Sequence, residues 1–215
     1  MKLYSYFRSS ASFRVRIALG LKGLPFEIVP VHLLRSGGEQ FKPEYRQLNP
    51  AGLVPTLDDD GTVLQQSLAI IEYLDERHPS PPLLPGSAGD RARVRAIALA
   101  IACEIHPLNN LRTLKYLTDT LGASEEAKTA WYRHWAEDGL AAVEAMLAGD
   151  GRSGRFCHGD EPTLADCCLV PQIFNAQRFE CRLGHVPRVM RVFDTCMTLP
   201  AFQRATPMAQ PDANA

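Results

Sequence analysis

Residues 4–21 read YSYFRSSASFRVRIALGL, and this stretch decides the fold. It predicts a short aromatic strand over 3–7, a polar break over 8–12 and an amphipathic helix after the break. In the helix, apolar side chains recur at three- and four-residue spacing, so one face should turn to a core. We expect Arg14 and Arg16 to point outward from that face.

Three serines, Ser9, Ser10 and Ser12, stand at the entrance of this helix. A serine there accepts a hydrogen bond from a free backbone N–H, and the aligned peptide dipoles give that end about half a positive charge. The serines therefore have two interpretations. They either cap the helix and do nothing else, or they form a site that favours an anion.

The composition indicates an ordinary globular protein. Of the 215 residues, 46% are hydrophobic and 22% are charged, and the formal net charge of −1 gives no reason to expect a nucleic acid partner. The N-terminus lacks a signal peptide pattern, and no window approaches the roughly 18 apolar residues of a membrane span. The six cysteines, all from Cys103 onward, show no metal-ligand spacing. We expect a cytoplasmic protein with reduced thiols and no metal.

The rest of the first eighty residues alternates strands and helices. A stop signal at 22–25 ends the first helix, and the crossover to the next strand predicts a parallel βαβ unit. The elements expected after it are a strand at 26–31, a loop with some helix at 34–46, a strand ending at 57, a strand including 63–64 and a helix at 68–74. This order is the thioredoxin-like arrangement.

Two further features of this region can hold a ligand. Pro55 starts a strand and is expected to be trans on base rates; if the Val54–Pro55 peptide is cis, the Val54 backbone is free to pair with a peptide-like ligand. Gln66 and Ser67 stand at a second helix entrance. Together with the first entrance, they suit a peptide with carboxylates at its ends, such as glutathione. Serines replace the redox cysteines of a thioredoxin, so a thiol must arrive with the ligand.

The breaker-rich segment around 78–87 marks a domain boundary. We expect domains at 1–80 and 88–215, a linker at 81–87, and only helices in the second domain. Its predicted parts are a helix at 91–121 kinked at Pro107, a helix from Ser124 to Gly149, a capping box of Thr163 and Asp166 before a buried helix, helices from Pro187 and Pro200, and a disordered tail at 207–215.

Four motifs in the chain resemble one known family. They are SSASFRVRIAL, LNPAGLVPTL, QQSLAIIEYL and GDEPTLADCCLVPQ, and the match extends from Leu3 to about Pro211. The sequence is similar to the zeta-class glutathione transferases. The resemblance implies an α+β thioredoxin-like N-terminal domain (βαβαββα), an all-α C-terminal domain and a homodimer. One departure is Ala11, where the family commonly has cysteine.

The resemblance also implies roles for individual residues in binding glutathione. Ser9, with Ser10 close by, would hydrogen-bond the sulfur, and Val54, before a cis Pro55, would pair with the cysteinyl backbone. Other implied contacts are Gln66 and Ser67 with the γ-glutamyl end, Gln40 with the glycyl end, and His106, Asn110 and Arg112 reaching toward the site from the second domain.

The implied activity is glutathione-dependent cis–trans isomerisation of a maleyl dicarboxylate by reversible thiolate addition. Maleylacetoacetate is the expected substrate, with maleylpyruvate as the nearest alternative. Because the substrate carries carboxylates and enolate charge develops during addition, nearby cations should help; the candidates are Arg8, Arg112 and Arg178. Two alternatives remain, namely a conjugating or dehalogenating transferase and a binding module without turnover.

Overall fold

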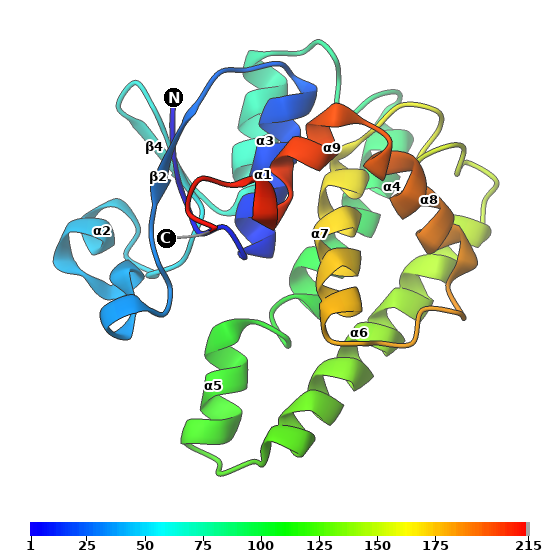
Figure 1. Ribbon diagram of the computed structural model, residues 1–215. Coiled ribbons are helices and arrows are strands. Elements are labelled where there is room, and N and C mark those ends of the chain that lie inside the picture. The colour runs from blue at the N-terminus through cyan, green and yellow to red at the C-terminus, as the bar shows by residue number, and fades with distance from the viewer. Residues whose placement is uncertain (214–215) are drawn as a thin grey trace. The chain divides into compact units, whose positions relative to one another are not determined.

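Strand β1 (Lys2–Ser5) lies inside a four-stranded sheet of order β2-β1-β3-β4. The other strands are β2 (Glu27–Pro30), β3 (Thr56–Asp59) and β4 (Thr62–Gln65). Strand β1 pairs parallel with β2 and antiparallel with β3, and β4 pairs antiparallel with β3. Helix α1 (Ser10–Leu21) connects β1 to β2, α2 (Pro43–Leu48) lies between β2 and β3, and α3 (Ser67–Arg77) follows β4, which confirms the predicted thioredoxin-like fold (Figure 1).

The chain, seen here in a computed structural model that describes residues 1–213, forms two units. One unit contains Met1–Leu84 together with Met197–Ala215, and the other contains Pro85–Cys196. The C-terminal segment, as far as residue 213, therefore groups with the sheet, whereas the sequence predicts that it belongs to the helical domain. No helix among the described residues is long and apolar enough to cross a membrane.

Helix α1 is covered on more than one side, by α3 and by the C-terminal helix α9 (Pro200–Ala205). A Cβ on Gly20 would come within 3.3 Å of the Ala201 Cβ, so the two helices meet at a glycine. The prediction that Arg14 and Arg16 point outward is wrong, because both are 2% exposed. The helix is enclosed, and polar groups inside the unit accept hydrogen bonds from both guanidinium groups.

Short helical turns fill the connection from β2 to β3. The 3₁₀ turns η1 (Arg35–Gly37) and η2 (Glu39–Phe41) precede α2, as the predicted mixture of loop and helix requires. The Tyr45 hydroxyl, on α2, donates to the Leu53 carbonyl at 2.6 Å and lies 2.9 Å from the Thr56 hydroxyl. The connection is thereby fixed to the start of β3.

The second unit is built from helices. They are α4 (Ala88–Leu99), the π-helix η3 (Ala100–Ile105), α5 (Leu111–Asp119), α6 (Glu125–Ala148), α7 (Leu164–Arg178) and α8 (Pro187–Met197). The predicted helix over 91–121 is not one kinked helix: it becomes π-helical, stops near Pro107 and begins again after Asn110. A proline has no N–H to donate within a helix, and the Asn110 side chain caps the new start.

The predicted capping box of Thr163 and Asp166 is confirmed at the start of α7. The Asp166 carboxylate accepts hydrogen bonds from the backbone N–H and the hydroxyl of Thr163, both at 2.8 Å. It also accepts from the backbone N–H of Cys157 at 2.8 Å. Asp166 has no exposed surface, so this carboxylate anchors the start of α7 to the loop before it.

The tail after α9 is ordered as far as the structure describes it. It contains the 3₁₀ turn η4 (Pro207–Ala209), and Gln210 and Asp212 are buried. The prediction of a disordered tail over 207–215 is wrong for 207–213, and residues 214–215 lie outside the described part. The tail is held because the Asp212 carboxylate accepts from the Phe7 N–H at 2.9 Å and the Gln210 amide donates to two carbonyls.

Asp150, after α6, should make stability depend on pH. It accepts hydrogen bonds from the buried Arg93 at 2.7 Å and from the backbone and guanidinium of Arg152. These contacts, with Arg93 first, hold the pKa of Asp150 well below its usual value. A carboxylate with a lowered pKa stabilises the fold above its unfolded pKa of about 3.9 and loses that contribution as pH falls toward the folded pKa.

We therefore expect Asp150→Asn to lower the free energy of unfolding at pH 7. The difference from the wild type should shrink as the pH falls below about 4. Urea unfolding at a series of pH values measures both quantities. A difference that stays constant down to the most acidic pH at which both proteins fold would contradict this assignment.

Candidate functional site

Three of the predicted site segments meet at one end of the sheet. In the strand register, Tyr4 of β1 pairs with Thr56 of β3, and Thr56 also faces Gln65 of β4. The end of β1, the start of β3 and the end of β4 therefore lie at the same edge. The residues that continue from these strands are Ser9 and Ser10 after β1, Val54 and Pro55 before β3, and Gln66 and Ser67 after β4.

The N-terminus of α1 offers a hydroxyl and a positive dipole end. Ser9 is the N-cap residue, and its Oγ accepts from the Ser12 N–H at 3.2 Å. Accepting uses a lone pair, so the Ser9 hydroxyl keeps its proton for another acceptor. The first turn has no acidic residue, and Ser9 is half-buried. This end of the helix therefore favours an anion that can reach Ser9. Ser10, the other predicted serine, is 5% exposed.

The N-terminus of α3 is a second position of this kind. Its N-cap, Gln66, is exposed and has a left-handed φ of +69°, which is uncommon for a residue other than glycine. The next residue, Ser67, accepts a hydrogen bond on its Oγ from Arg14 Nη1 at 3.2 Å. Since the guanidinium only donates, the Ser67 hydroxyl can donate to a carboxylate.

Arg14 is a site residue that we missed in the sequence. It is 2% exposed and places a buried positive charge beside Ser67, at the helix end that already favours an anion. One signal was present: Arg14 follows Ser10 by four residues in a predicted helix, which puts both on the same face.

The turn before β3 contains the cis peptide and approaches the backbone of Gln40 at Gly52. The Val54–Pro55 peptide is cis, as the family resemblance implied and contrary to the base-rate expectation. Gly52 has a φ of +62°, and a Cβ there would lie 3.2 Å from the Gln40 carbonyl oxygen. The Gln40 side chain is buried, and its Oε1 accepts no hydrogen bond from the described residues. An amide oxygen of this kind can accept an N–H from a peptide ligand.

Arg8 is the cation adjacent to the Ser9 hydroxyl in the chain. Its side chain is exposed, and the guanidinium carbon lies 4.9 Å from the centre of the Phe7 ring. Phe7 is 5% exposed and therefore forms a fixed base for this arginine. The arrangement leaves a positive charge in solvent beside the α1 terminus.

The remaining predicted residues belong to the second unit. Asn110 caps α5 by accepting the Arg112 N–H at 3.1 Å, and Arg112 itself is exposed. The Arg178 guanidinium lies 4.7 Å from the Phe179 ring centre, and His106 is half-buried after η3. Their approach to Ser9 stays a prediction.

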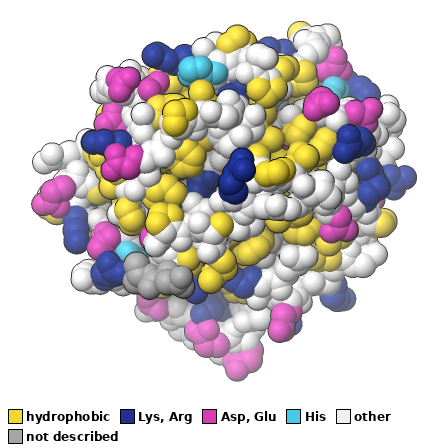
Figure 2. All heavy atoms as spheres, turned by 45° about the horizontal axis from the view of Figure 1, so that its top comes forward, with side chains coloured by type: hydrophobic (Ala, Val, Ile, Leu, Met, Phe, Trp, Pro, Cys, Tyr) yellow, Lys and Arg dark blue, Asp and Glu magenta, His cyan; other side chains and the backbone are white. Residues whose placement is uncertain are grey.

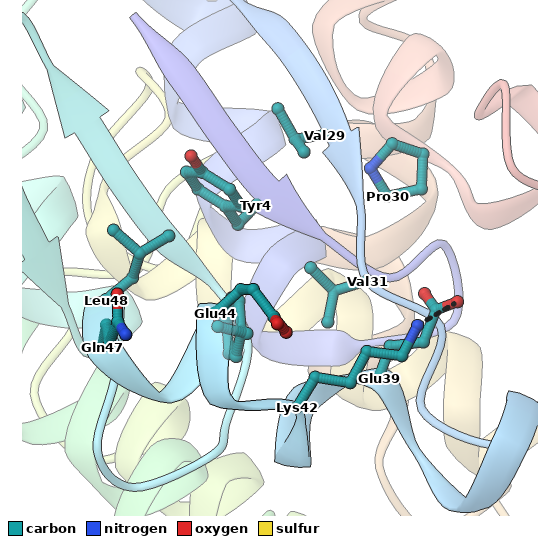
Figure 3. Close-up of a pocket in the computed structure, with 10 residues that line it drawn as sticks. Tyr4, Val29, Pro30, Val31, Glu39, Lys42, Glu44, Gln47 and Leu48 are labelled. Atoms are coloured by element: carbon teal, nitrogen blue, oxygen red, sulfur yellow. Dashed lines mark ion pairs between the residues drawn. The ribbon is translucent and has the colours of Figure 1, made fainter.

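The first unit also contains a pocket (Figure 3). It has a volume of about 450 Å³ and is lined by Tyr4, Val29, Pro30, Val31, Glu39, Lys42, Glu44, Tyr45, Gln47 and Leu48. Lys42 and Glu39 form an ion pair at 3.6 Å at its rim. None of the predicted site residues lines this pocket, so we do not assign the site to it.

The surface and the side-chain clusters restrict the chemistry further. The face in Figure 2 mixes acidic, basic and apolar side chains, in agreement with the net charge of −1. Among the described residues, no group of three or more His, Cys, Asp or Glu side chains could hold a metal ion. The predicted site residues themselves offer hydroxyls, helix termini, an amide and arginines.

Comparisons with known proteins identify the family. The chain matches the glutathione S-transferase N-terminal domain over residues 3–82 and the C-terminal domain over residues 128–194. It is 49% identical over 216 residues to the maleylacetoacetate isomerase of Pseudomonas aeruginosa, covering 100% of both proteins. A holo maleylpyruvate isomerase structure, a bacterial zeta-class glutathione transferase, is 51% identical with a TM-score of 0.96 and covers 99% of this chain and 100% of its own. This chain is a zeta-class glutathione transferase.

The solved structure of a further relative contains ligands. The maleylacetoacetate isomerase of Anaeromyxobacter dehalogenans 2CP-1 is 43% identical with a TM-score of 0.86, and the match covers 100% of this chain and 97% of that one. Its structure contains dicarboxyethyl glutathione and citrate in the active site. In that relative, one active site accommodates a glutathione thioether with carboxylates.

Proposed function

We propose that this zeta-class glutathione transferase is a glutathione-dependent cis–trans isomerase of maleyl dicarboxylates, with maleylacetoacetate as its substrate. The observation that carries the proposal is the meeting of two helix N-termini and the Val54–Pro55 turn at one end of the sheet. Relatives named as maleylacetoacetate isomerases support it, and they match almost the full length of the chain.

The residues at this edge fit glutathione, end by end. Ser67, supported by Arg14, and the exposed Gln66 suit the γ-glutamyl carboxylate at the N-terminus of α3. Val54 suits the cysteinyl backbone, and the free amide oxygen of Gln40 suits an N–H toward the glycyl end. This assignment places the sulfur near Ser9 and Ser10.

Ser9 is the residue that we assign to the sulfur. A free thiol with a pKa of about 8.5 is only about 3% thiolate at pH 7. The Ser9 hydroxyl and the α1 dipole both favour the anion, so they raise the thiolate fraction. When bound, glutathione supplies a thiolate that adds to the conjugated cis double bond and turns it into a single bond. Rotation about this bond and elimination of the thiolate then give the trans product.

In this proposal, arginines bind the carboxylates of the substrate. Arg8 stands beside Ser9 in the chain and receives a substrate carboxylate or the enolate charge that develops on addition. Arg112 and Arg178 are the candidates from the second unit, with His106 and Asn110 as supporting polar residues. Each charge would lower the barrier most if it acted on the enolate oxygen.

The test is an isomerisation assay with purified protein, glutathione and maleylacetoacetate, followed by the absorbance of the enone. We expect a rate at least 10²-fold above that of glutathione alone, roughly what a placed nucleophile and one oxyanion donor provide. A rate equal to that of glutathione alone would reject the proposal. Chloride release from a 2-halo acid faster than isomerisation would replace it with a dehalogenating transferase.

Maleylpyruvate is the second candidate substrate, because a relative named maleylpyruvate isomerase is 51% identical over 213 residues. The two substrates differ by a methylene, and such a difference changes specificity by about 10- to 200-fold at most. The ratio of kcat/KM for the two compounds decides between them.

We also propose that the protein is a homodimer located in the cytoplasm. Light scattering would test the oligomeric state, and fractionation of the source cells would test the location.

A further inference from the structure

The backbone of Phe7, two residues before Ser9, is held by two buried charged side chains. Its N–H donates to Asp212 Oδ2 at 2.9 Å, and its carbonyl accepts from Arg16 Nη2 at 3.1 Å. Asp212 is 4% exposed and Arg16 is 2% exposed. Phe7 lies between the end of β1 and the start of α1, so both contacts act on the connection that carries Arg8 and Ser9.

Arg16 ties this connection to two other parts of the first unit. Its Nε donates to the Ala205 carbonyl at 3.0 Å, and its Nη1 donates to the Ser5 hydroxyl at 3.1 Å. Burial lowers the pKa of Arg16 to about 9, although the charge of Asp212 acts in the opposite direction. The Asp212 carboxylate therefore lies at the Phe7 N–H, and the Arg16 guanidinium lies at the Phe7 carbonyl.

The C-terminal tail is itself fixed against this region. The Gln210 amide donates to the carbonyls of Arg204 and Thr206, both at 2.8 Å. Ala213 packs against a buried cluster that includes Phe7 and Val54. Figure 1 shows the C-terminal segment, in red, returning to the sheet unit beside the blue N-terminal segment. The tail therefore brings Asp212 to Phe7 from a fixed position.

We propose that Asp212 is a positioning residue of the site: from the C-terminal tail it holds the Phe7 peptide and so sets the place of Ser9 and Arg8. Arg16 completes the arrangement from α1. The proposal rests on the proposed function of Ser9 toward a glutathione sulfur. A hydroxyl that shifts by about 1 Å loses much of its effect on the reacting atom, so the geometry of this connection matters for catalysis.

The test compares Asp212→Ala and Asp212→Asn with Met208→Ala, a change at a 66% exposed tail residue, as the control. Asp212→Ala removes the acceptor of the Phe7 N–H, while Asp212→Asn keeps an acceptor and removes the charge. The measurements are hydrogen exchange at the Phe7 amide, the thiolate absorbance of bound glutathione across pH, and the kcat and the KM for glutathione in isomerisation.

We expect Asp212→Ala to exchange the Phe7 amide about tenfold faster or more and to move the thiolate titration to higher pH. Its kcat at pH 7 should fall about tenfold, with the KM for glutathione changed less than about threefold. Asp212→Asn should lie between this variant and the wild type, and Met208→Ala should match the wild type.

Faster amide exchange with an unchanged titration and kcat would give Asp212 a structural role only and would overturn the proposal. If Asp212→Ala does not fold, Asp212→Asn decides in the same way. A wild-type protein whose bound glutathione titrates like free glutathione would instead reject the function of Ser9. The two failures are therefore distinguishable.

Discussion

Replacing Ser9 by alanine should lower kcat/KM for isomerisation by about 10²-fold. Ser9 caps α1 through its Oγ, and its hydroxyl proton remains available for the glutathione sulfur. Alanine removes the hydrogen bond to the thiolate, which then forms at a higher pH. Steady-state kinetics across pH measure the loss, and the pH at which the rate rises should increase in the variant.

Capping and catalysis by Ser9 can be separated with a second variant. Alanine at an N-cap costs about 1 kcal/mol of stability, whereas glycine costs only a few tenths. Ser9→Gly should therefore keep nearly the stability of the wild type and lose as much activity as Ser9→Ala. Ser9→Thr keeps a hydroxyl and should retain part of the activity. Activity that follows stability across the three variants would show that Ser9 only caps the helix.

Replacing Asp166 by alanine should produce the largest loss of stability in the chain. The carboxylate is fully buried and accepts hydrogen bonds from the backbone N–H groups of Cys157 and Thr163 and from the Thr163 hydroxyl. Alanine leaves these buried donors without partners, at about 1–3 kcal/mol each. We expect the free energy of unfolding to fall by about 4 kcal/mol, measured by urea unfolding.

Asp194→Ala, at an exposed position of α8, is the matched control and should change stability by less than about 0.5 kcal/mol. Thr163→Ser should retain most of the capping box, since serine keeps the hydroxyl. A loss below about 1 kcal/mol in Asp166→Ala would mean that water or a rearranged loop satisfies the donors of Cys157 and Thr163.

The sequence predicts the sheet and the helix termini well, because these depend on local signals. The serines before α1, the proline before β3 and the capping box of Thr163 and Asp166 each mark a boundary by chemistry that acts within a few residues. The parallel pairing of β1 with β2 then follows from the βαβ unit. These signals were enough to bring the three site segments to one edge.

One error is local, because the predicted helix over 91–121 stops near Pro107 and begins again after Asn110. The others concern contacts between distant parts of the chain. The helical spacing predicts that Arg14 and Arg16 point outward, but the Ser67 hydroxyl and the Ala205 carbonyl accept hydrogen bonds from them. The position at the chain terminus predicts a disordered tail, yet the Asp212 carboxylate accepts a hydrogen bond from Phe7, 205 positions away in the chain. No local pattern encodes partners that far apart, so the positioning of Ser9 by Asp212 emerged only from the structure.

A pH titration of glutathione bound to the wild-type protein, followed by thiolate absorbance, tests the assignment of Ser9 to the sulfur. We expect the bound thiol to ionise well below the free value of about 8.5, and Ser9→Ala to move its ionisation most of the way back to that value. A bound thiol that titrates near the free value, in both proteins, would contradict the assignment of Ser9 and the α1 terminus to the sulfur.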